Sequence, residues 1–154
     1  MREQQYGYIV NVSSIAGLIS VPFQGLYSAS KFALEGFTEA LRAETKTYGI
    51  RVVLVEPGDF HTGFTEHRQK AIQSDQESPY YEQFNKTIDV IECDEIRGSS
   101  PDRIAALVER IINKSTPQLR YMTGPESQKL AVSLKKMLPY RLFEWLIMKY
   151  YKLN

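Results

Sequence analysis

Tyr27 and Lys31 form the first pair of residues whose types and spacing suggest chemistry. They stand one helical turn apart in the segment YSASK, so on a helix the lysine ammonium lies on the same face as the phenol. A free phenol titrates near pKa ~10, and a nearby cation favours its ionised form, which makes a tyrosine usable as an acid or a base. The same spacing also occurs on surface helices that perform no chemistry, so the pair needs further support.

Two other segments bring polar groups that fit the same chemistry. Ser14 follows an apolar run, residues 8–13, and its hydroxyl can hold a substrate oxygen beside the phenol. The segment PGDFHT, residues 57–62, follows a second apolar run and offers backbone groups and a threonine hydroxyl to a planar amide ring. Taken singly, a serine after a strand and a Pro-Gly turn are ordinary loop features. They support a catalytic site only if the fold brings them together with Tyr27 and Lys31.

The surrounding periodicity predicts how these residues meet. Residues 8–13 and 51–56 are rich in β-branched side chains with little polar alternation, as expected of strands that are covered on both faces of a parallel sheet. Residues 27–48 are expected to form an amphipathic helix that stops at Gly49. Its apolar stripe consists of Leu26, Ala29, Phe32, Ala33, Phe37, Ala40 and Leu41. In such a βαβ unit, ligands bind beyond the carboxyl ends of the strands, where Ser14 and the Pro-Gly turn lie.

The pattern weakens after the second strand. Residues 59–100 are expected to be an irregular excursion with short helical stretches at 62–72 and 80–90. Ser100 is a candidate N-cap for a second helix, whose apolar stripe consists of Ile104, Leu107, Val108, Ile111 and Ile112.

A short strand and two helices are expected at the end of the chain. The strand covers residues 119–123 and the first helix covers residues 128–137. After Pro139 a strongly apolar segment, residues 142–150, is expected to pack against the sheet or a sister subunit rather than on a membrane surface, because its charges are few and mixed.

Composition excludes several classes of protein. The chain has 154 residues, 43% hydrophobic and 24% charged, with a net charge of +1 and no block of like charge that would follow a nucleic-acid backbone. The single cysteine, Cys93, fits a reducing compartment, so we expect a cytoplasmic protein. No leader pattern and no apolar run of the roughly 18 residues that a membrane span needs is found.

Three motifs together resemble the short-chain dehydrogenase/reductase family. NVSSIAG, YSASKFALEG and VEPGDFHT match the family in order and spacing, and the resemblance is specific over residues 1–62. It continues more loosely over residues 100–124, where SSPDRIA and YMTG are similar to the later helix and last strand. The segment PFQGLYSASKFALEGFTEAL is most similar to the hydroxysteroid and retinol dehydrogenase-like members. The resemblance implies an α/β fold, the C-terminal portion of a Rossmann-type parallel, doubly wound sheet.

The resemblance also implies a reaction and a set of residue roles. Ser14 would orient the substrate oxygen, Tyr27 would be the acid/base, and Lys31 would favour the ionised tyrosine while binding the nicotinamide ribose. The nicotinamide end would contact four further residues, Pro57, Gly58, Phe60 and Thr62. The reaction implied is reversible hydride transfer between NAD or NADP and a small carbonyl/alcohol substrate. Family members pair through the helix at 27–48, so a homodimer or homotetramer is expected.

The family's N-terminal dinucleotide-binding half is absent from this sequence. It contains neither the TGxxxGxG turn that receives the pyrophosphate nor the NNAG stretch. We therefore expect residues 1–154 to form one incomplete domain, with a catalytic βαβ core at 1–58, a substrate-loop region at 59–100, and the last strand and C-terminal helices at 101–154. The alternative is a non-catalytic fragment that acts only through association with itself or a partner.

Other reactive residue types have simpler interpretations. His61 and His67 lack an accompanying ligand cluster, so we expect no metal site. Cys93 is expected to be an incidental thiol. Asn11 does not match the family's catalytic asparagine, which comes from an earlier helix, and is expected to be structural.

Overall fold

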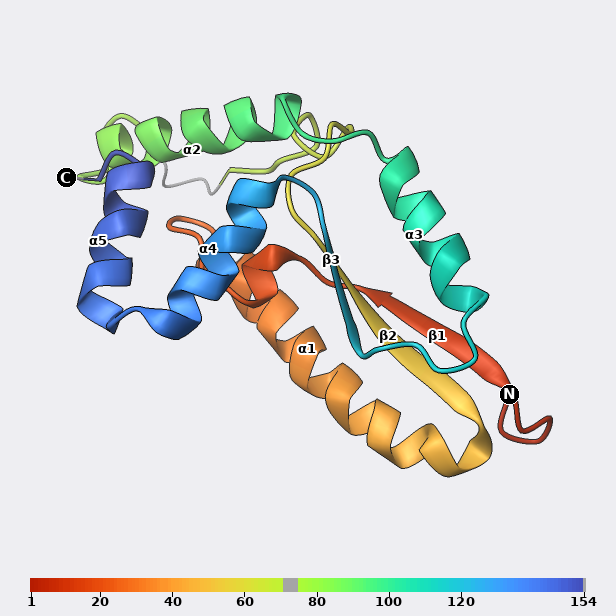
Figure 1. Cartoon of the computed structure of the whole chain (residues 1–154). Helices are drawn as coiled ribbons and strands as arrows, with labels where there is room; N and C mark the ends of the chain where they lie inside the picture. The colour runs from red at the N-terminus through yellow and green to blue at the C-terminus, as the bar shows by residue number, and fades with distance from the viewer. Residues whose placement is uncertain (71–74, 154) are drawn as a thin grey trace.

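The computed structural model describes residues 1–70 and 75–153 (Figure 1). Within them, β1 (Gly7–Val12), β2 (Ile50–Pro57) and β3 (Arg120–Thr123) form a parallel sheet in the order β1-β2-β3. These strands agree with the three predicted from the sequence to within a residue or two at each end. The predicted α/β class with a parallel sheet is confirmed.

The central strand β2 is the core of the molecule. Val52, Val53, Leu54 and Val55 are fully buried, because β2 has a neighbouring strand on each side and a helix over each face. β1 differs from the prediction that it is covered on both faces, since residues 8–11 are only partly buried and Val12 is 49% exposed. The physical reason is its place at the edge of the described sheet, where it pairs with β2 alone.

Alternate residues of β2 face different helices. Val53 and Val55 pack with Leu107 and Ile111 of α3 (Asp102–Ile112) on one face of the sheet. The other face is covered by α1 (Gly25–Thr45), which continues into a short 3-10 turn, η2 (Lys46–Tyr48). Figure 1 shows α1 and α3 on opposite sides of the strands. Gly49 ends this helical segment with φ 65, as the sequence predicts.

The apolar stripe of α1 does not face the sheet. The helix buries Ser28, Glu35 and Thr38 instead, whereas Leu26 is 91% exposed and Phe37 is 60% exposed. The small residues of the stripe, Ala29, Ala33 and Ala40, are exposed as well. The outer face of α1 is therefore an open apolar surface.

The region between β2 and α3 is more regular than predicted. The expected helical stretch at 80–90 is part of a longer helix, α2 (Tyr81–Ile96). The stretch expected at 62–72 is not helical in its described part, which consists of turns up to residue 67, and residues 71–72 lie outside the described residues. The expectation that Ser100 is the N-cap of α3 is wrong by one residue, because Pro101 occupies the cap position. The Ser100 hydroxyl accepts a hydrogen bond from the Asp102 N–H at 3.3 Å.

The last two helices lie beyond the carboxyl ends of the strands (Figure 1). α4 (Glu126–Met137) and α5 (Tyr140–Tyr150) follow β3 directly. Phe143 of α5 packs with Val132 of α4 and with Ile15 and Ile19, which lie in and after the 3-10 turn η1 (Ile15–Gly17). Of the two partners expected for this segment, the sheet is not the one observed, since Phe143 packs on α4 and η1, and a sister subunit stays a prediction. None of the helices in the described ranges has the length and apolarity to cross a membrane.

Candidate active site

A cavity of about 630 Å³ opens at the carboxyl ends of the strands, between the sheet and the C-terminal helices. Its wall includes all seven residues that the sequence singles out, Ser14, Tyr27, Lys31, Pro57, Gly58, Phe60 and Thr62. They come from three separate segments, which the parallel arrangement of β1 and β2 brings to one edge.

Ser14 lies between the end of β1 and η1. Its Oγ accepts a hydrogen bond from the Ala16 N–H at 3.0 Å and so caps η1. The hydroxyl proton points to the Pro57 carbonyl at 3.4 Å, which is a long and therefore weak hydrogen bond. The Ser14 hydroxyl consequently has a fixed position and can donate its hydrogen bond to a stronger acceptor.

Tyr27 and Lys31 lie on the first two turns of α1 and are both half-buried. The Lys31 Nζ is 5.6 Å from the centre of the Tyr27 ring, and it donates one hydrogen bond to the Val12 carbonyl at 3.1 Å. An ammonium has three protons, so two remain for other acceptors. The Tyr27 ring also lies beside the Phe64 ring, with 6.0 Å between the ring centres.

The post-β2 segment, residues 57–62, is held mainly by its backbone. The Gly58 N–H donates to the Thr123 carbonyl at 2.8 Å, and the His61 N–H donates to the Ser99 carbonyl at 3.0 Å. Between them, the N–H and carbonyl of Phe60 form no hydrogen bond with any residue of the described ranges. A donor and an acceptor on one residue are therefore left without a partner among the described residues.

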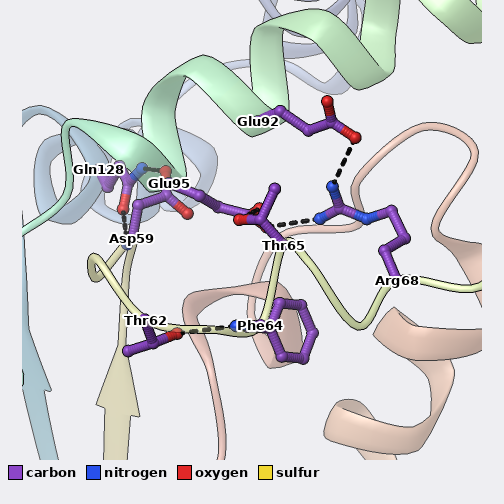
Figure 2. Close-up of polar contacts among 8 residues, drawn as sticks. All are labelled: Asp59, Thr62, Phe64, Thr65, Arg68, Glu92, Glu95 and Gln128. Carbon is purple, nitrogen blue, oxygen red and sulfur yellow. Dashed lines mark hydrogen bonds and ion pairs between the residues drawn. The ribbon is translucent and has the colours of Figure 1, made fainter.

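Five polar residues that the sequence motifs do not indicate also line the cavity, together with Asp59 of the post-β2 segment. They are Asp94, Glu95, Gln128, Tyr150 and Tyr151. Figure 2 shows how Arg68 ties the loop after the post-β2 segment to α2: it pairs with Glu95 at 2.5 Å and Glu92 at 3.4 Å. Thr65 donates to Glu95 at 2.5 Å. Each partner lies far along the chain, and no local pattern indicates these contacts.

The acidic groups on this wall influence one another. The pKa of Asp59 is raised to about 6, chiefly by burial and also by the charges of Asp94 and Glu95, although the Gln128 hydrogen bond and Arg68 oppose the shift. Burial also raises the pKa of Tyr150, whose hydroxyl donates to Asp94 at 2.5 Å.

The rest of the cavity wall is largely apolar. The side chains come from η1, α4 and α5 and their flanks, and they are Ile15, Ile19, Ala131, Leu134, Phe143, Leu146 and Ile147. Such a wall can bury an apolar group through the hydrophobic effect, and Ser14 and Tyr27 line the same cavity.

The remaining reactive residues have structural contacts. Asn11 donates to the Thr38 hydroxyl at 2.9 Å, which joins β1 to α1 and fits the structural role expected for it. His61 Nδ1 is 2.9 Å from the Ile96 carbonyl, and His67 Nδ1 is 2.6 Å from the Gly63 carbonyl. Within residues 1–70 and 75–153 no group of His, Cys, Asp and Glu has the arrangement of a metal site.

Comparisons with known proteins agree with the motifs and the fold. A family model described as short chain dehydrogenase matches residues 1–73. Over its whole length the chain is 38% identical to the 3-ketodihydrosphingosine reductase of Bacteroides thetaiotaomicron, of which it covers 57%. It is also 32% identical, over 90% of its length, to retinol dehydrogenase 8 of Bos taurus, of which it covers 46%.

A solved structure gives the same result for the fold. The short-chain dehydrogenase/reductase of Burkholderia phymatum in complex with NAD superposes with a TM-score of 0.69 at 23% identity, covering 89% of this chain and 50% of that one. The chain spans about half the length of the curated relatives it matches. The motifs around Ser14, Tyr27 and Pro57, the parallel α/β fold and these relatives together identify the chain as a member of the short-chain dehydrogenase/reductase family.

Proposed function

We propose that the protein to which this chain belongs is an NAD(P)-dependent oxidoreductase that interconverts a carbonyl group and an alcohol. The observation that carries the proposal is the meeting of Ser14, Tyr27 and Lys31 with the post-β2 segment on one cavity at the carboxyl ends of parallel strands. Each feature alone is ordinary, and their convergence is what supports catalysis.

The proton chemistry is assigned to three side chains. The Ser14 hydroxyl donates to the substrate oxygen and holds it beside the Tyr27 hydroxyl, because its present bond to the Pro57 carbonyl is weak. Tyr27 Oη gives its proton to that oxygen in reduction and takes it back in oxidation. The Lys31 ammonium lies over the Tyr27 ring and places a positive charge beside the reacting groups.

The nicotinamide end of the cofactor is assigned to the post-β2 segment and to Lys31. The Phe60 N–H and carbonyl would hold the carboxamide of the nicotinamide, with Pro57, Gly58 and Thr62 around it. The two free protons of the Lys31 ammonium would bind the ribose hydroxyls. When bound, the nicotinamide supplies or accepts the hydride.

The apolar wall supports a substrate with a large hydrophobic body. A cavity of about 630 Å³ lined by side chains of α4 and α5 suits a long or bulky apolar ketone. The name of the Bacteroides relative, a 3-ketodihydrosphingosine reductase, points to reduction of a ketone as the direction of the reaction. A cytoplasmic location is part of the same proposal and rests on the lone cysteine, Cys93.

Residues 1–154 would then form one incomplete domain with the core, substrate-loop and C-terminal regions expected from the sequence. We assign the exposed stripe on α1 to pairing between copies of the complete protein, because Leu26 and Phe37 are large and apolar on an open face. One observation also favours a different function, a non-catalytic association module. The edge strand β1 and the α1 stripe both offer surfaces to a partner chain.

Replacement of Tyr27 by Phe in the protein at its full natural length tests the proposal. Turnover of a ketone with NADH or NADPH is expected to fall by more than about a thousandfold while cofactor affinity changes little, because only the proton-transfer group is lost. Tyr48→Phe, at an exposed position of η2, is the matched control. If Tyr27→Phe keeps activity within tenfold of the parent, Tyr27 is not the acid/base.

A further inference from the structure

Gln128, on the first turn of α4, binds both the backbone and the side chain of Asp59. Its Oε1 accepts a hydrogen bond from the Asp59 N–H at 2.9 Å, and its Nε2 donates to Asp59 Oδ2. A backbone N–H can only donate, so the amide oxygen must face it, and this orientation directs the NH2 group to the carboxylate. Figure 2 shows both bonds reaching the end of β2. One side chain therefore holds one residue of the post-β2 segment at two points.

The same amide also closes the space over Gly58. A Cβ atom on Gly58 would overlap Gln128 Oε1 and stand 3.2 Å from Ile15 Cδ1. Gly124, which has φ 125, packs against Gly58 from the end of β3, where a Cβ would stand 3.1 Å from the Gly58 nitrogen. A Cβ atom at Gly58 would therefore displace the Gln128 amide, and one at Gly124 would crowd the Gly58 backbone.

Other bonds hold the segment on either side of this point. The Gly58 N–H is bound by Thr123, and the Asp59 carbonyl accepts from the Ser99 N–H at 3.1 Å. Gln128 supplies the bond between them, to the Asp59 N–H. The next peptide groups along the chain are the free N–H and carbonyl of Phe60. The Phe60 N–H shares a planar peptide group with the Asp59 carbonyl, and the Phe60 carbonyl shares one with the His61 N–H. Their direction therefore depends on how firmly the flanking backbone is held, by Ser99 at both peptide groups and by Gln128 at Asp59.

We propose that Gln128 is a positioning residue for cofactor binding: it fixes the Asp59 backbone and so presents the Phe60 N–H and carbonyl to the carboxamide of the nicotinamide. This role rests on the proposed function, since it assigns the Phe60 groups to that ligand. Preorganised donors and acceptors bind more tightly because no ordering is needed when the ligand arrives. Nothing in this role requires Gln128 to touch the cofactor or the substrate.

The charges around Asp59 explain why a neutral amide suits this position. Burial raises the pKa of Asp59, and the charges of Asp94 and Glu95 act in the same direction. The hydrogen bond from the NH2 group of Gln128 acts against this rise. A carboxylate in place of the amide would still accept from the Asp59 N–H, but its second oxygen would repel the Asp59 carboxylate. The two hydrogen bonds between Gln128 and Asp59 therefore need an acid on one partner and an amide on the other.

Gln128→Leu tests the role in the protein at its full natural length, because leucine has a similar size and forms neither bond. Loss of hydrogen bonds to a charged group is expected to weaken NADH or NADPH binding, measured by fluorescence titration, roughly 10- to 100-fold. Turnover at saturating cofactor is expected to fall much less. Gln83→Leu, at an exposed position of α2, is the matched control and should leave affinity unchanged.

Exchanging the acid at position 59 and the amide at position 128 tests whether the lost cofactor affinity can be restored. In the double variant Asp59→Asn with Gln128→Glu, the new carboxylate on α4 accepts from both the backbone N–H and the new side-chain amide after β2, so the two bonds are restored with the charge moved to the other partner. The double variant is expected to regain most of the lost affinity, and Gln128→Glu alone to regain little. Hydrogen exchange of the backbone amide at position 59 without cofactor should follow the same order, with protection lost in Gln128→Leu and regained in the double variant.

The outcomes separate this role from the function on which it rests. If the parent binds cofactor and Gln128→Leu binds it within twofold as tightly, the positioning role is wrong and the proposed function stands. The role is also wrong if affinity falls but the double variant recovers amide protection at position 59 without recovering affinity. If the parent binds neither NADH nor NADPH, the proposed function and the role fail together.

Discussion

Glu35 of α1 and Glu56 of β2 are buried beside each other, and the Arg120 guanidinium contacts both. Arg120 Nε lies 3.1 Å from Glu35 Oε2 and 3.1 Å from Glu56 Oε1. In the described part of the chain, neither Glu35 Oε1 nor Glu56 Oε1 has a hydrogen-bond partner. Two carboxylates around one cation leave excess negative charge in a buried place, and a proton on one of them removes it.

The first prediction is that the stability of the protein depends on pH through Glu56. Burial and the charge of Glu35 raise the pKa of Glu56 to about 7, while Arg120 opposes the shift. Because this value lies above the ordinary 4.5, the folded protein holds the proton more tightly than the unfolded chain. Its contribution to stability is therefore complete below pH 4.5 and is lost as the pH rises through 7, by about 3 kcal/mol at most.

Urea unfolding of the parent and of Glu56→Gln from pH 4 to 9 measures this contribution. The stability of Glu56→Gln relative to the parent should increase as the pH rises from about 4.5 to about 7 and then level off. Glu39→Gln is the control, since Glu39 pairs with Arg120 from a side chain that is 54% exposed. A difference between parent and Glu56→Gln that stays constant over the range would contradict the prediction.

The second prediction separates the two roles of Lys31. Lys31→Ala in the full-length protein should lower turnover and also weaken NADH or NADPH binding by more than about tenfold, whereas Tyr27→Phe should lower turnover alone. The reason is that the ammonium lies over the Tyr27 ring and has two further protons for the cofactor. Lys46→Ala, at an exposed position of η2, is the control for a lost charge. Unchanged cofactor affinity in Lys31→Ala would restrict the lysine to the proton chemistry.

The third prediction concerns assembly through α1. Phe37→Glu should convert the full-length protein to monomers in sedimentation velocity, because it places a charge at the centre of an apolar face that would be covered in an oligomer. Tyr80→Glu exchanges another exposed aromatic residue, next to α2, and should leave the assembly intact. A parent protein that already sediments as a monomer would show that α1 is not an interface.

The fourth prediction concerns the 154-residue chain on its own. It should show no measurable NAD(P)-dependent turnover even though Ser14, Tyr27 and Lys31 line one cavity. The sequence has no TGxxxGxG turn to bind the pyrophosphate, so only contacts to the nicotinamide end remain, and these should bind a dinucleotide weakly. Fluorescence titration with NADH and NADPH measures the binding. Micromolar affinity accompanied by reduction of a ketone would contradict this expectation.

The local elements and the family can be predicted from the order of residues alone. Strands, helices and the stop at Gly49 follow from side-chain periodicity and backbone preference, which act within a few residues and are therefore visible in the order of residues. The convergence of Ser14, Tyr27 and the Pro-Gly turn could also be predicted, because parallel strands must end at the same edge of their sheet.

Two features depend on tertiary packing: which face a helix turns toward the sheet, and which residues far apart in the sequence are in contact. Periodicity marked an apolar stripe on α1, yet the helix turns Glu35 and Thr38 to the sheet, because Glu56, Arg120 and Asn11 supply polar partners there. Gln128 and Asp59 are brought together by the path of the chain from β2 through α2 and α3 to α4. Contacts between residues far apart in sequence depend on how whole elements pack, and the local pattern of residues carries no record of that packing.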